Sequence, residues 1–108
     1  MPKSRLWVMP STFNPKLNSK TIMPVLSKFY GIVIRMLCAR PFAAHFHATY
    51  QDWELVVGIS PVRILNGSAP IRVRAMVLEW AGLHQAELLA AWQSVSRAQA
   101  PARIEPLL

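Results

Sequence analysis

"VRILNGSAPIRVRAMVLEWAGLH", residues 62–84, decides the fold because the spacing of its apolar residues changes partway along it. Residues 62–65 are rich in β-branched and aliphatic side chains, which is typical of a short strand. Asn66-Gly67 marks a turn, Ser68 can cap a helix, and Pro70 is tolerated in the first helical turn. The stretch therefore predicts the end of a sheet followed by the start of a helix.

Downstream of this stretch, apolar residues recur every 3.6 positions as far as about Gln99. A straight helix of that length would extend for about 45 Å, more than twice the length of a typical strand. We therefore expect a break, and Gly82 is the residue that best tolerates one. The stripe predicted to face the sheet comprises Val73, Met76, Val77, Trp80, His84, Leu88, Ala91, Trp92 and Val95.

Upstream, three further segments alternate with the period of two that is typical of strands. They are 28–38, about 44–50 and 52–59. The links between them are short, which favours an antiparallel meander. In 44–50, Phe46 and Tyr50 are the better core residues, so the histidines of this segment are expected to point outward.

Strands first and helix last predict an α+β fold: a small antiparallel sheet of three to four strands, followed by a C-terminal helix or kinked helix pair packed on one face. Residues 1–22 contain three prolines and no sustained apolar period, so they are interpreted as a flexible basic extension. Residues 23–108 are interpreted as a single domain that ends in an extended tail. Trp53, Trp80 and Trp92 are expected at the centre of the contact between sheet and helix.

The charge is distributed unevenly. The chain has a formal net charge of +7, and its first 50 residues contain no acid. This asymmetry predicts an acidic or polyanionic partner. Cys38 is the only cysteine, no apolar run is long enough to span a bilayer, and no secretory signal is evident, so the expected location is the cytoplasm, without a membrane partner.

Four motifs in order resemble one bacterial family, the domain of unknown function 4160. They are "MPVLSKFYGIVIRM" (23–36), "HFHATY" (45–50), "ILNGSAP" (64–70), and "EWAGLHQAELLAAW" (79–92) with "IEPL" (104–107). The resemblance covers roughly 23–107. It implies a component of toxin–antitoxin type with a small partner protein encoded nearby. Ala44 stands where the family usually has a proline.

His45 and His47 are the chief candidates for chemistry. They share one face of a strand and can supply two metal ligands, but a structural or catalytic zinc site needs three or four. A third would have to come from His84, Glu54, Asp52 or Cys38, none of which has a recognisable ligand spacing with the pair. We therefore predict no metal and no cofactor, and expect His84 to be a hydrogen-bonded core residue.

Two functions remain open. The leading hypothesis is a small interaction or regulatory protein that binds a partner protein or RNA through His45, His47, Lys28, Arg35 and Arg40. The alternative is a small metal-independent endoribonuclease, because histidine suits proton transfer near neutral pH and cations stabilise a phosphate. Its catalytic candidates are His45, His47, Arg35 and Tyr30.

Overall fold

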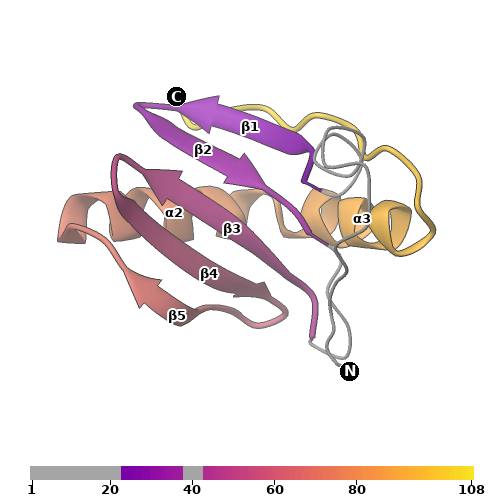
Figure 1. The fold of residues 1–108 in the computed structure, drawn as a ribbon, viewed down its shortest axis with the longest axis horizontal. Helices are drawn as coiled ribbons and strands as arrows, with labels where there is room; N and C mark the ends of the chain where they lie inside the picture. The colour runs from indigo at the N-terminus through magenta and orange to yellow at the C-terminus, as the bar shows by residue number, and fades with distance from the viewer. Residues whose placement is uncertain (1–22, 38–42) are drawn as a thin grey trace, which may run out of the picture.

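The computed structural model describes residues 23–37 and 43–108. They form five strands followed by two helices (Figure 1). The elements are β1 (Val25–Phe29), β2 (Ile32–Arg35), β3 (His45–Tyr50), β4 (Trp53–Ile59), β5 (Val62–Ser68), α2 (Ile71–Leu83) and α3 (Gln85–Ser96). The predicted extension 1–22, together with Cys38 and Arg40, lies outside the described residues.

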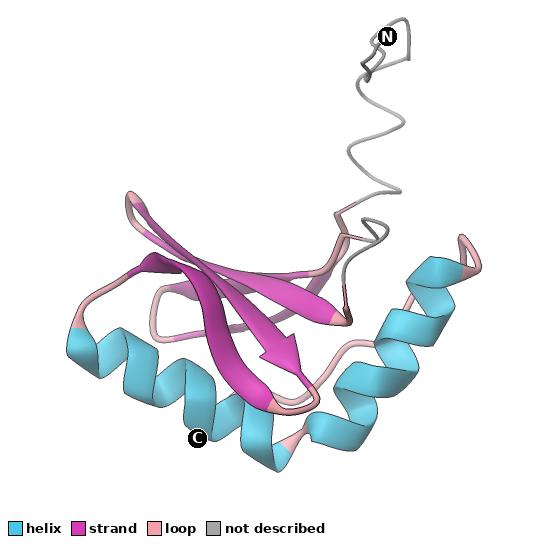
Figure 2. Ribbon diagram, turned by 90° about the horizontal axis from the view of Figure 1, so that it is seen from below, coloured by secondary structure: helices cyan, strands magenta, loops and turns pink. Residues whose placement is uncertain are grey.

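The five strands form one antiparallel sheet in the order β1-β2-β3-β4-β5, as the short links predicted. Helix α2 runs along one face of this sheet, and α3 turns away from it at the end of the sheet (Figure 2). This confirms an α+β fold with C-terminal helices, of which α2 covers one face of the sheet and α3 lies at its end. No helix in the described part of the chain is long and apolar enough to cross a membrane.

The sheet has one strand more than the three to four predicted. The segment 28–38, interpreted as one strand, folds as the hairpin of β1 and β2. Tyr30 and Gly31 form its turn, with φ values of 51° and 81°. Glycine adopts a positive φ readily but tyrosine rarely does, which is why the turn was missed. The reversal places Phe29 in the core beside Ile32, although continuous alternation had put them on opposite faces.

Strand β5 extends to Ser68, beyond the predicted end at 65. Gly67 sits inside this strand with a φ of 87°, and the pairing with β4 shifts between Val56 and Val57. The extra residue of this irregularity is Leu65, so Asn66-Gly67 continues the strand just after it and does not make a turn. Ser68 does not cap the helix either: Pro70 precedes α2, and no side chain caps it.

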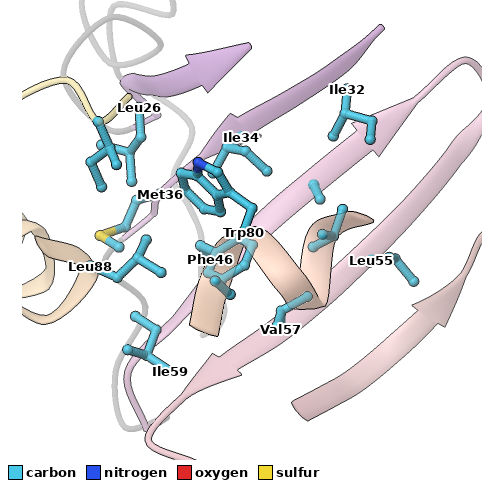
Figure 3. Packing of buried hydrophobic residues seen from close by; sticks show 14 of the residues in the cluster. Leu26, Ile32, Ile34, Met36, Phe46, Leu55, Val57, Ile59, Trp80 and Leu88 are labelled. Atoms are coloured by element: carbon cyan, nitrogen blue, oxygen red, sulfur yellow. The ribbon is translucent and has the colours of Figure 1, made fainter. Parts of the chain in front are cut away.

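Trp80 lies at the centre of the core, fully buried among side chains from the sheet and from both helices (Figure 3). Its ring meets Phe29 and Phe46 with centroids 5.5 and 5.7 Å apart. The predicted stripe is confirmed, because Val73, Val77, Trp80, Leu88 and Ala91 are all buried. Trp53, by contrast, is exposed at the end of β4, so its predicted place in this contact was wrong.

The predicted break in the helical segment occurs at His84, two residues after Gly82. His84 ends α2 with φ −117° and ψ 26° and immediately precedes α3. Its Nδ1 lies 2.6 Å from Oε1 of Glu87, and its ring packs on Trp80. His84 is thus hydrogen-bonded as expected, although it is only partly buried.

The C-terminal tail is extended, as predicted, and packs along β1 (Figure 1). The Ile104 backbone N–H donates to the Leu26 carbonyl at 2.8 Å, and the Ile104 side chain is buried. The indole N–H of Trp80 donates to the Glu105 carbonyl at 2.8 Å. The tail thereby covers one edge of the sheet.

Candidate functional site

The candidate site lies on the sheet face that points away from α2, which we call the outer face. Alternation along each strand buries Ile34, Phe46 and Val57 against α2 and places their neighbours outward. The outer face carries Lys28, Val33, Arg35, His45, His47, Thr49, Glu54, Val56 and Arg63.

Strand pairing brings several predicted site residues together. Arg35 on β2 is directly opposite His47 on β3. Lys28 pairs with Val33, and Val33 pairs with Thr49. Lys28 is therefore displaced along the strands by two residues from the Arg35–His47 pair. The β1-β2 hairpin makes this possible, since a single straight strand could not place Lys28 and Arg35 on neighbouring strands.

His47 is oriented by a carboxylate. Its Nδ1 lies 3.1 Å from Oε2 of Glu54, the diagonal cross-strand neighbour on β4. A carboxylate accepts hydrogen bonds, so Nδ1 carries the proton and donates. Within the described part of the chain, Nε2 of His47 is buried and has no hydrogen-bond partner. The atom that would act on a substrate is thus covered in this structure.

His45 is buried, with 5% of its surface exposed. Its Nδ1 donates to the Ala43 carbonyl at 2.9 Å, and its ring packs on Trp92 of α3 with centroids 5.2 Å apart. The expectation that both histidines point into solvent was therefore wrong for His45. The cause is α3, which reaches the end of the sheet where β3 begins and covers the first outward position.

The remaining predicted residues are separate from this group. The rings of His45 and His47 are 5.3 Å apart, but Tyr30 lies in the β1-β2 turn and lines a cavity beside α2. Arg40 lies outside the described residues. Among the residues that the structure describes, no three His, Cys, Asp or Glu side chains come close enough to hold a metal ion.

Two outer-face residues were missed by the sequence reasoning. Glu54 was considered as a possible third metal ligand, but it orients His47. Arg63 was not singled out, and it lies opposite Gly58, which itself pairs with His45. The two-residue turn Gln51-Asp52 sets the β3-β4 register and could have revealed Glu54. The two-residue turn Ser60-Pro61 sets Val62 opposite Ile59 and Arg63 opposite Gly58, so it could likewise have revealed Arg63.

Comparisons with known proteins give one match. The family described as Domain of unknown function (DUF4160) matches residues 31–93, more than half of the chain. This confirms the resemblance carried by the four motifs, although the match begins at 31 rather than at 23. The searches of curated proteins and of solved structures found no match. The chain belongs to the DUF4160 domain family.

Proposed function

We propose that this protein binds RNA with the outer face of its sheet, as the RNA-binding component of a toxin–antitoxin-type pair. The observation that carries the proposal is the arrangement of Lys28, Arg35 and Arg63 on the face opposite α2. Cations on an open surface attract a polyanion and release its counterions, which makes binding favourable and sensitive to salt.

The outer face favours a strand of phosphates over a small acidic ligand. The three cations span the sheet from β1 to β5, which is about 19 Å for four steps of about 4.8 Å. Among the outward residues of the described strands, Glu54 is the only acid, and it is hydrogen-bonded by His47. An extended single strand of RNA can follow such a surface and use each cation for a different phosphate.

Binding is favoured over catalysis by the state of the two histidines. A general acid or base must reach the proton that it transfers, directly or through one water. His45 is buried against Trp92, and Nε2 of His47 is buried as well. The alternative of an endoribonuclease is supported by the 5.3 Å spacing of the rings and by the carboxylate that orients His47.

Fluorescence anisotropy with a labelled single-stranded RNA tests the proposal. We expect Lys28→Ala, Arg35→Ala and Arg63→Ala each to weaken binding several-fold. Each should also reduce the slope of log affinity against log salt by about 0.7, the value for one phosphate contact on a single strand. The matched control is Arg74→Ala, which removes an exposed arginine from α2 and should change neither quantity.

The same samples separate binding from cleavage. Intact RNA after prolonged incubation supports a binding protein, and cleavage that is lost in His47→Gln would support the endoribonuclease instead. If Arg74→Ala weakens binding as much as Arg35→Ala does, the interaction is a diffuse charge effect and the assignment of the outer face is wrong.

A further inference from the structure

The side of α2 that faces away from the sheet is exposed and holds two large apolar residues. Val73, Val77 and Trp80 bury the opposite side of the helix in the core. Ile71 and Leu83, at the two ends of α2, are 75% and 67% exposed. These two side chains are too far apart to form one apolar patch, so the charges and the cavity beside them are needed to identify an interface.

A cation and an anion lie on the same flank of this exposed side. Arg72 and Glu79 are seven residues apart, or almost two full turns, so their side chains lie one above the other along the helix. Both are exposed. Within the described residues, the ion pairs are His47–Glu54 and His84–Glu87, so neither Arg72 nor Glu79 has a partner of opposite charge.

A cavity of about 610 Å³ opens on that same flank. Its size is within the range of protein binding pockets. The N-terminal half of α2 forms one wall, and the turns of the two hairpins form the other. Its lining combines apolar and aromatic side chains with one cation and one anion, and comprises Tyr30, Tyr50, Pro70, Arg72, Val73, Met76, Glu79, Leu107 and Leu108.

We propose that two copies of this chain associate through α2, with the two helices antiparallel about a two-fold axis that passes between Ala75 and Met76. A two-fold axis perpendicular to the two helices makes them antiparallel. Residues on one flank of α2 then lie beside residues on the same flank of the other copy. Arg72 of one copy then lies opposite Glu79 of the other, and the pair is formed twice.

The same axis accounts for Leu83 and the cavity. Leu83 lies on the flank of Arg72 and Glu79, and the two-fold places it opposite Ser68, three residues before α2 begins in the other copy. The cavity reaches Pro70 beside this point and is also lined by Tyr50 and Tyr30. Each copy thus offers an exposed leucine and the cavity that receives it, which is the reciprocity that a two-fold interface requires.

Small residues on the exposed side allow the helices to approach. A Cβ added at Gly82 would meet no atom within 4 Å, so nothing in a single copy requires a glycine there. Glycine inside a helix costs about 1 kcal/mol relative to alanine. The two-fold places Met76 of the second helix opposite Ala75 and places Ala69, just before that helix, opposite Gly82. Close approach of the second chain at the usual helix separation of about 8–10 Å gives that glycine a role. The self-complementary charges identify a second copy as the occupant.

Sedimentation equilibrium of the full chain, from about 1 µM to about 200 µM, tests the association itself. We expect a monomer–dimer equilibrium in this range, and Leu83→Gln should weaken it about tenfold or more. The matched control is Leu65→Gln, an exposed leucine on β5 that packs over Gly58 and should leave the equilibrium unchanged. A chain that stays monomeric throughout, or a dimer that Leu83→Gln leaves intact, would overturn the proposal.

Charge reversal tests the arrangement of the dimer. Arg72→Glu alone and Glu79→Arg alone each place like charges opposite one another and should each weaken the dimer about tenfold. The double variant restores opposite charges at both positions and should recover the dimer. Arg72→Glu adds an acid to the first turn of α2, which favours the helix, so lost association would not reflect unfolding. A dimer that tolerates single reversals, or that the double variant does not restore, would contradict the antiparallel pairing.

Discussion

Gly67 and Gly82 have opposite surroundings. Gly67 has a φ of 87°, and a Cβ at this position would overlap the Glu54 carbonyl oxygen on the neighbouring strand. Gly82 lies in α2 with open space where a Cβ would be. The backbone and the neighbouring strand require glycine at 67, whereas a single copy of the chain does not require it at 82.

The two glycines therefore predict opposite responses to alanine. Gly67→Ala should lower the free energy of unfolding by more than about 1 kcal/mol, because it combines a strained φ with a backbone overlap. Gly82→Ala should raise it by about 1 kcal/mol through helix propensity. Urea unfolding at a concentration where the chain is monomeric measures both. Equal effects of the two substitutions would contradict the difference in their surroundings.

Trp80 combines burial with one specific hydrogen bond. Trp80→Ala should cost about 3–5 kcal/mol, since it removes the largest buried side chain of the core. Trp80→Phe keeps much of the packing but leaves the Glu105 carbonyl without its indole donor, so its cost should be smaller. Thermal unfolding of both variants checks the order. An unchanged melting temperature for Trp80→Ala would mean that the stripe of α2 does not face the core.

At the scale of elements, the C-terminal tail has a larger role than its sequence predicted. "PARIEPLL" carries two prolines and no period, so an extended conformation was foreseeable. Its docking was not, because that depends on a free edge at β1 and on the indole of Trp80, which lies 25 residues away from its acceptor. Local patterns do not encode contacts of this range.

Ile104 tests the docking of the tail. Ile104→Ala should lower the free energy of unfolding by about 2–5 kcal/mol, because this side chain is buried in the core. Leu108→Ala is the matched control, since Leu108 is fully exposed and its removal should have almost no effect. Similar losses in the two variants would show that general shortening of apolar side chains in the tail, rather than burial of Ile104, determines stability.

The helices and strands were otherwise predictable to the extent that local sequence determines them. The periodic stripe from Val73 to Val95 predicted the helical segment and its buried side correctly. The β1-β2 hairpin was missed because Tyr30 takes a conformation that its side chain disfavours, so the residues carried no ordinary turn signal. The break moved from Gly82 to His84, where the chain turns from α2 to α3.

At the scale of the whole molecule, the sheet separates two surfaces. The outer face carries Lys28, Arg35 and Arg63, and the exposed side of α2 lies beyond the opposite face (Figure 2). Two chains joined through α2 would therefore keep both outer faces accessible. The proposed RNA surface and the proposed dimer contact do not compete.

The candidate site was foreseen in its residue types and only partly in its geometry. Lys28, Arg35 and His47 were singled out from charge and alternation, and pairing of β1, β2 and β3 brings them together. The burial of His45 was not foreseen, because it depends on where α3 ends up in space. Arg63, by contrast, was foreseeable, because it precedes the irregularity in β5 and the two-residue turn Ser60-Pro61 fixes its pairing with Gly58.

The tail that packs along β1 also sets the order of events during synthesis. Residues 101–108 are translated after every other described segment, yet the Ile104 N–H donates to the carbonyl of Leu26, which lies in the first described strand. A nascent chain still lacking the tail has the complete sheet and both helices, but its Trp80 indole has no Glu105 carbonyl to bind. The domain can reach its full stability only after Ile104 and Glu105 have been synthesised. A premature stop before codon 104 would therefore release a chain that proteases recognise as incompletely folded.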